Sequence, residues 1–221
     1  MERRPVSAIV LAGGRSSRFG SDKLAAELEG RPLLAHAIRA VAAVADEVLV
    51  VVAPHADADE VLVILAPDAA PAPAAPAPAS PAPASPVIRL VRDRDPFAGP
   101  LAGLREGAAA ARNGTLLVVG GDMPGLVPDV LRLLARVVAE GAEAAILGVD
   151  DPGAVAPLPM ALDRAAATDR LEALLATERR SLRALLDELR TVTLAPAEWR
   201  RLDPEARTLH DVDWPEDLFR S

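Results

Sequence analysis

The chain has 221 residues and contains no cysteine, which excludes disulfides and metal sites built from thiolates. It also has no uninterrupted apolar run of membrane-spanning length. Its formal net charge of −8 at pH 7 argues against nucleic acid as the main partner. Lysines and aromatic residues are few beside abundant Ala, Arg and Pro. That bias is typical of a GC-rich genome and indicates no function. We expect neither a nucleic-acid nor a membrane partner, and a cytoplasmic location.

Strand-like and helix-like segments alternate along most of the chain. Segments typical of strands cover residues 6–11, 47–52, 87–91, 115–119, 142–149, 158–162 and 191–194. Segments typical of helices cover residues 32–45, 101–112, 128–140, 164–177 and 181–189, and a short helix is expected from Pro215. Residues 57–65 fit either type. Repeated βαβ units predict an α/β fold, a single domain over residues 1–221 with a mostly parallel, Rossmann-like sheet and helices on both faces.

Residues 66–86 interrupt this pattern, because they are nearly all Ala, Pro and Ser. Prolines at this density remove backbone donors and fix φ, so the segment cannot form a packed core. We predict a low-complexity insertion loop. It is either a solvated excursion between two strands or a segment recognised by a proline-binding partner.

The segment LAGGRSSRFGSDK, residues 11–23, directly follows the first predicted strand. Glycines at the end of a buried strand present bare backbone N–H groups to phosphates, and Gly13 and Gly14 provide them here. Arg15, Arg18 and Lys23 add positive charge around the same loop. The spacing fits neither the P-loop nor the dinucleotide-binding fingerprint. The sequence therefore predicts a nucleoside triphosphate site of another kind.

A second motif, Gly120-Gly121-Asp122-Met123-Pro124, follows another buried strand. A carboxylate at the carboxyl end of a parallel strand faces the ligand cleft, and its oxygens suit the Mg²⁺ that accompanies a nucleotide. Asp122 is therefore a candidate metal ligand, although an aspartate before proline also serves as a helix cap or turn residue.

Two weaker motifs complete the set. Gly99-Pro100-Leu101-Ala102-Gly103-Leu104 could be an ordinary turn opening a helix. In Asp211-Val212-Asp213-Trp214-Pro215-Glu216-Asp217-Leu218, Asp213 could assist at the metal or cap the helix that Pro215 begins. His36, His55 and His210 have no spacing that supports a metal site.

Taken in order, these motifs resemble the molybdenum cofactor guanylyltransferases, nucleotidyltransferases with a nucleotide-diphospho-sugar transferase-like fold. The resemblance covers residues 6–218 apart from the insertion. Leu-Ala-Gly-Gly and Gly-Pro-Leu-Ala-Gly are typical of the guanylyl branch of these enzymes. The resemblance implies that the protein transfers GMP from GTP to molybdopterin with Mg²⁺. It also implies a monomer that contacts molybdoenzyme maturation proteins transiently.

The resemblance also implies roles for individual residues. Asp122, Lys23, Arg15 and Arg18 would be catalytic, and Asp122 and Asp213 would hold the metal. Nucleotide contacts would come from Leu11, Ala12, Gly13, Gly14, Lys23, Asp93 and Asp122, and substrate contacts from Gly99, Pro100 and Gly103. By itself, Asp93 could equally be a solvated turn residue.

The chain departs from the family pattern at three places. Ala53 stands where an Asn is usual, Phe19 replaces Met and Trp214 replaces Thr. These changes leave phosphate chemistry intact and bear on the choice of base. A cytidylyltransferase, or another small-molecule nucleotidyltransferase of the same fold, remains an alternative. So does a non-catalytic nucleotide-binding module that docks through its proline segment.

Overall fold

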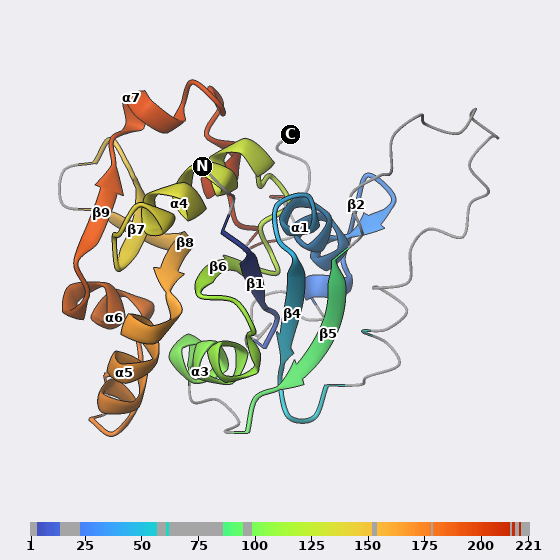
Figure 1. Cartoon of the computed structure of the whole chain (residues 1–221). Coiled ribbons are helices and arrows are strands. Elements are labelled where there is room, and N and C mark those ends of the chain that lie inside the picture. The colour runs from blue at the N-terminus through green and yellow to red at the C-terminus, as the bar shows by residue number, and fades with distance from the viewer. Residues whose placement is uncertain are drawn as a thin grey trace, which may run out of the picture.

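The computed structural model describes residues 4–13, 23–56, 61, 86–94, 99–151, 154–177, 179–212, 214 and 217. Their main feature is a seven-stranded sheet in the order β5-β4-β1-β6-β8-β7-β9 (Figure 1). Its parallel part comprises β1 (Val6–Leu11), β4 (Glu47–Val52), β5 (Val87–Arg92) and β6 (Thr115–Gly120). β8 (Val155–Asp163) runs antiparallel to β6 and to β7 (Ala144–Gly148), and β9 (Thr191–Leu194) is parallel to β7.

The order of the parallel strands decides where a ligand can bind. From β1 the chain moves outward through β4 to β5, and then returns to the other side of β1 to form β6. β4 and β6 are buried along their whole length, as expected of parallel strands covered on both faces. A reversal of strand order opens a crevice beyond the carboxyl ends of the strands. The predicted motifs follow β1, β5 and β6 at this edge.

Helices cover both faces of the sheet (Figure 1). α1 (Leu33–Ala42) and α4 (Pro128–Ala139) pack on one face, and α3 (Pro100–Ala110), α5 (Arg164–Leu175) and α6 (Leu182–Glu188) pack on the other. α4 buries a stripe at helical spacing, Val130, Leu131, Leu134, Ala135 and Val138. α7 (Pro196–Trp199) lies against β7, where the indole N–H of the fully buried Trp199 donates to the carbonyl of Gly148 (3.0 Å).

A small hairpin precedes α1 and was not predicted from the sequence. After the 3-10 turn η1 (Lys23–Ala25), β2 (Glu27–Leu28) pairs with β3 (Arg31–Pro32). Glu29 and Gly30 between them both have positive φ, 53° and 74°, which suits a two-residue hairpin turn. Nε2 of His36 lies 2.8 Å from the Leu28 carbonyl oxygen, so the hairpin is attached to α1.

The sequence predictions of elements are confirmed except at their ends. Each predicted strand and helix within the described ranges is present, with ends shifted by a few residues, and the mostly parallel α/β fold is confirmed. α1 begins at Leu33 rather than at Pro32, because Pro32 still pairs with Glu27 in the hairpin. Apart from Val61, residues 57–65 lie outside the described residues, as do residues 66–85 and the start of the helix expected from Pro215. No helix in the described ranges has the length and apolar character needed to cross a membrane.

A buried glutamate joins the amino ends of three strands. Glu47, 4% exposed, accepts hydrogen bonds from the Ser7 hydroxyl (2.6 Å), the Arg112 amide (2.6 Å) and the Arg89 guanidinium (2.8 Å). Burial alone would raise the pKa of Glu47, but the hydrogen bonds from Ser7, Arg112 and Arg89 together outweigh it and hold the pKa below its ordinary value. This cluster lies at the opposite end of the strands from the predicted motifs, so its role is structural.

We expect Glu47→Gln to lower the free energy of unfolding at pH 7 by about 3 kcal/mol, because it leaves the Arg89 charge without its carboxylate partner. A lowered folded-state pKa stabilises the fold above the ordinary pKa of a glutamate, and this contribution is lost as the pH falls through the folded-state value. Denaturant unfolding between pH 7 and pH 3 should therefore show a shallower acid decline in the variant. Glu140→Gln is the control, since its exposed pair with Arg136 at 3.8 Å is worth at most about 0.5 kcal/mol. Equal losses in both variants would contradict the assignment.

Candidate functional site

The loops after β1, β4 and β6 are tied together at the carboxyl edge of the sheet. The Ala12 amide donates to the Val51 carbonyl (2.7 Å), and the Gly121 amide donates to the Leu11 carbonyl (3.0 Å). A Cβ on Gly13 would come 3.3 Å from the Ala53 nitrogen, so the glycine lets these two loops approach closely. Leu11, Ala12 and Gly13 are thus in place, while Gly14, Arg15 and Arg18 lie outside the described residues.

Lys23 and Asp122 form an ion pair at this edge. Nζ of Lys23 lies 2.9 Å from Oδ2 of Asp122, and the two side chains are 12% and 31% exposed. An ideal Cβ on Gly120 would stand 2.5 Å from Oδ1 of Asp122, so a larger residue at position 120 would displace this carboxylate. The structure therefore brings together the two residues that the sequence analysis placed at the phosphates and at the metal.

Lys23 is also the only lysine in the chain, since every other basic residue apart from the histidines is arginine. Lysine is scarce in the composition, and the position of the single lysine is a further signal. A compositional bias that favours arginine everywhere else makes a single lysine at a predicted phosphate site a strong signal. Lysine and arginine side chains bind phosphate differently, because the lysine ammonium is a compact point charge and the arginine guanidinium is a planar fork.

Asp93 follows β5 and faces the helix that begins with the Gly-Pro motif. Its amide donates to the Val52 carbonyl (2.9 Å). A Cβ on Gly103 would lie 3.9 Å from Oδ2 of Asp93 and 3.6 Å from Cδ2 of Leu11. Asp93, Leu11 and Gly103 therefore lie close together beside the loop after β1.

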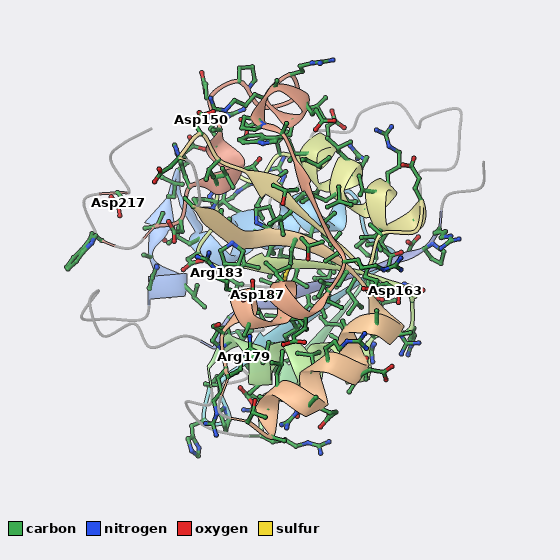
Figure 2. All side chains as sticks on the ribbon, turned by 90° about the vertical axis from the view of Figure 1, so that its left-hand side faces the viewer. Asp150, Asp163, Arg179, Arg183, Asp187 and Asp217 are labelled. Atoms are coloured by element: carbon green, nitrogen blue, oxygen red, sulfur yellow. The ribbon has the colours of Figure 1, made fainter. Side chains whose placement is uncertain are left out.

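Gly99 and Pro100 start α3 a few residues from that region. Gly99 has φ +87°, a conformation that favours glycine, and a Cβ there would lie 3.2 Å from the carbonyl oxygen of Arg180. The sequence analysis did not single out Arg180. Its neighbour Arg179 is paired with Glu188 (2.7 Å) on the side of the molecule that faces the viewer in Figure 2. The backbone of Arg180 thus lies beside the Gly-Pro motif because two segments distant in sequence pack together.

A cavity of about 790 Å³ lies next to Asp122. Its described lining residues come from the β2–β3 hairpin and α1, from the turn after Asp122 and from the C-terminal segment: Leu28, Glu29, His36, Pro124, Gly125, Glu205, Arg207, Leu209, His210, Asp211, Val212, Trp214 and Asp217. The Val212 amide donates to the Asp122 carbonyl (3.0 Å), so the fourth motif is joined to the second. Asp213 lies outside the described residues.

Two residues labelled in Figure 2 relate this cavity to the amino ends of the strands. Asp217, which lines the cavity, lies on the opposite side of the view from Asp163. Asp163 pairs with Thr115 at the amino end of β6. The cavity therefore belongs to the carboxyl edge of the sheet, together with the Lys23–Asp122 pair.

Comparison with known proteins agrees with this geometry. The family model for the MobA-like NTP transferase domain matches residues 8–192. The chain belongs to this family. A probable molybdenum cofactor guanylyltransferase from Chloroflexus aggregans is 33% identical over 216 residues, covering 96% of this chain and 91% of that protein. A molybdenum cofactor guanylyltransferase from Burkholderia vietnamiensis is 35% identical over 192 residues, which cover 85% of this chain and 84% of that protein.

Solved structures share the fold of this MobA-like domain. Molybdopterin-guanine dinucleotide biosynthesis protein A from Archaeoglobus fulgidus superposes with a TM-score of 0.70 at 21% identity, covering 97% of this chain and 95% of the other. The 4-diphosphocytidyl-2C-methyl-D-erythritol synthase from Anaerococcus prevotii superposes with a TM-score of 0.68 at 19% identity. The match covers 98% of this chain and 96% of the other. At these identities the likeness shows the fold alone.

The described residues of this MobA-like domain fit a metal that arrives with a nucleotide. Mg²⁺ in such sites takes one or two carboxylates and completes its shell with phosphate oxygens and water. Asp122 supplies a partly exposed carboxylate at the crevice. Within the described ranges, no three His, Cys, Asp or Glu side chains gather into a metal cluster. Asp122 is thus a described carboxylate of the kind that a nucleotide-bound cation uses.

Proposed function

We propose that this protein transfers GMP from GTP to the terminal phosphate of molybdopterin, giving the guanine dinucleotide cofactor and pyrophosphate. As a MobA-like NTP transferase, it is a nucleotidyltransferase of molybdenum cofactor biosynthesis. The observation that carries the proposal is the Lys23–Asp122 pair at the carboxyl edge of the sheet, near both the end of β1 and the cavity.

The nucleotide is assigned to the side formed by the loops after β1, β4 and β5. Amides of Gly13 and Gly14 would hold the phosphates, and Lys23, Arg15 and Arg18 would offset their charge. Leu11, Ala12 and Asp93 would contact the nucleoside, since a carboxylate accepts hydrogen bonds from guanine or ribose donors. Gly103 leaves space beside Asp93, which favours a role on this side. Contacts from Gly99 and Pro100 to substrate remain a prediction.

Mg²⁺ would be held by Asp122 and, in this proposal, also by Asp213. When bound with the triphosphate, it would neutralise charge that develops on the phosphate oxygens. Before the nucleotide arrives, Lys23 balances the Asp122 carboxylate. Both groups are then available to the incoming nucleotide without either charge having been left unpaired.

The chemistry is an in-line displacement. A phosphate oxygen of the acceptor attacks the α-phosphorus of GTP, a new P–O bond forms, and the bond to the bridging oxygen breaks as pyrophosphate leaves. A phosphate monoester is mostly a dianion at pH 7, because its second pKa is about 6. No side chain has to remove a proton from the nucleophile. The protein contributes positioning and charge neutralisation.

The acceptor is assigned to the cavity beside Asp122. Its volume of about 790 Å³ is in the range of small-molecule sites. Its wall includes Pro124 and Val212, and both are joined directly to the Asp122 segment. In this proposal a phosphate of the acceptor enters from the cavity and approaches the α-phosphorus in line with the leaving pyrophosphate.

We further propose that residues 1–221 act as one nucleotidyltransferase domain in which residues 66–86 are a solvated insertion. The protein would work in the cytoplasm as a monomer and meet molybdoenzyme maturation proteins transiently. Deletion of residues 66–85 is expected to leave GMP transfer unchanged, and loss of transfer would contradict this part of the proposal.

The test is pyrophosphate release with each of GTP, CTP, ATP and UTP in the presence of Mg²⁺, with and without molybdopterin. Release that requires both GTP and molybdopterin is the expected result. Release with none of the four nucleotides in the presence of molybdopterin would overturn the proposal and leave another acceptor or a non-catalytic role.

A cytidylyltransferase is the second candidate, and Ala53 is the observation that favours it. Ala53 packs against Gly13 at the predicted nucleoside side, where the family usually has an asparagine. A preference for CTP in the four-nucleotide comparison would assign the protein to that reaction, which would use the same fold and the same metal carboxylate.

A further inference from the structure

The cavity proposed for the acceptor is lined mainly by acidic and apolar side chains. Among its described lining residues there are four carboxylates, Glu29, Glu205, Asp211 and Asp217, and one arginine or lysine, Arg207. His36 already contacts the Leu28 carbonyl. A phosphorylated acceptor carries about −1.5 to −2 charge at pH 7, so four carboxylates repel it. Among the described lining residues, Arg207 is the arginine that can offset this repulsion.

The backbone of Arg207 is held firmly against the Asp122 segment. A Cβ on Gly125 would come 2.5 Å from the carbonyl oxygen of Arg207, so only glycine permits this approach. Ala206, just before it, has a left-handed backbone with φ 56°. The Thr208 hydroxyl accepts a hydrogen bond from the Val127 amide (3.1 Å). Arg207 thus starts from a fixed position on the cavity wall.

A buried carboxylate also constrains the Arg207 side chain. Asp203 is 0% exposed, and its Oδ2 accepts a hydrogen bond from the Thr208 amide (2.8 Å). Its Oδ1 is buried, has no hydrogen-bond partner among the described residues, and lies 3.8 Å from Nε of Arg207. A buried carboxylate needs a compensating charge, and Arg207 provides it.

The guanidinium of Arg207 keeps its outer edge available. Its two ion pairs, with Asp203 (3.8 Å) and with Glu205 (3.5 Å), both use Nε. Within the described part of the chain, Nη1 and Nη2 take part in neither pair. The side chain is 61% exposed. The two terminal nitrogens of an arginine form the edge that binds phosphate in a bidentate manner.

We propose that Arg207 binds the anionic part of the acceptor and that Asp203 is a positioning residue that acts through Arg207. This inference rests on the proposed transfer of GMP to a phosphorylated acceptor. Asp203 and Glu205 attract Nε, the two terminal nitrogens would bind the ligand, and the four lining carboxylates would discriminate against anions that Arg207 does not bind. Arg207 then determines the affinity for the acceptor and not the affinity for GTP.

Arg207→Ala tests the binding role. Loss of a charge-assisted contact is expected to raise KM for molybdopterin on the order of 10- to 100-fold. KM for GTP, kcat at saturating acceptor and the thermal midpoint should remain within about 2-fold or a few degrees of the parent values. Arg201→Ala is the matched control, because Arg201 is also exposed and bonds a backbone carbonyl, that of Ala197 (3.0 Å), outside this cavity.

Asp203→Asn tests the positioning role. The substitution keeps the shape of the side chain and an oxygen for the Thr208 amide but removes the charge. It is expected to raise KM for molybdopterin about 5-fold in the parent and to have no further effect in the Arg207→Ala background. If the role of Asp203 were purely structural, Asp203→Asn would raise KM for molybdopterin in the parent and in the Arg207→Ala variant alike. It would also change KM for GTP.

Direct binding separates this inference from the proposed function. Anaerobic calorimetry of molybdopterin with the nucleotide-free protein should show weaker binding to Arg207→Ala than to the parent and to Arg201→Ala. If the parent transfers GMP to molybdopterin and Arg207→Ala retains the parent KM and affinity, the role of Arg207 is overturned while the function stands. If the parent neither binds molybdopterin nor transfers GMP to it, the proposed function fails and the role of Arg207 fails with it.

Discussion

Asp122→Ala is expected to abolish GMP transfer, lowering kcat by about 10³-fold or more. The variant removes the carboxylate that we propose as a Mg²⁺ ligand, so charge on the phosphate oxygens would no longer be neutralised in the transition state. It also leaves Lys23, only 12% exposed, without its partner at 2.9 Å. Pyrophosphate release under saturating GTP, Mg²⁺ and molybdopterin measures the loss.

The control for Asp122→Ala is Asp129→Ala. Asp129 is an exposed carboxylate paired with Arg132 on α4, away from the cavity beside Asp122. It should retain the parent rate. Circular dichroism of both variants excludes unfolding as the cause. Turnover within 10-fold of the parent in Asp122→Ala would remove this residue from the metal site.

Lys23→Ala is expected to lower kcat about 100-fold, which corresponds to roughly 3 kcal/mol of lost transition-state stabilisation for one preorganised donor. Lys23→Arg separates charge from geometry. An arginine keeps the charge, but its planar guanidinium does not fit a site shaped around a compact ammonium, and we expect at least a 10-fold loss.

The single lysine makes an independent measurement possible. An amine-selective reagent can modify only Lys23 and the chain terminus, so the extent of modification reports directly on Lys23. GTP with Mg²⁺ should protect Lys23, and CTP should protect it less. Full activity of Lys23→Arg, or modification that GTP does not slow, would contradict the assigned role.

The sequence determined the order of elements and the chemistry of the strand ends. Short β-branched runs such as Val6–Leu11 and Glu47–Val52 can form buried strands without knowledge of their neighbours. Glycines and an aspartate directly after such strands identify a phosphate and metal edge from local spacing alone. The strand predictions are confirmed because hydrophobic periodicity acts within a few residues, whereas the phosphate and metal edge stays a prediction.

Other features depended on the tertiary structure. Lys23 and Asp122 are 99 residues apart, and nothing in either segment encodes their 2.9 Å contact. The antiparallel insertion of β8 between β6 and β7, the hairpin over residues 27–32 and the approach of Arg180 to Gly99 likewise come from packing between distant segments.

The cavity shows most clearly the difference between what local sequence predicts and what tertiary packing decides. Its wall combines a hairpin near the start of the chain, the turn after Asp122 and the segment around Arg207. The sequence analysis gave His36 and His210 no role and did not consider Arg207 or Asp203, because each is unremarkable in its own segment. A buried carboxylate finds its compensating charge, and a cavity its lining, only when the fold brings these segments together. The sequence by itself determined the order of elements and the family to which the chain belongs, because both depend on local patterns. The tertiary structure decided which side chains line the cavity, because they come from distant segments.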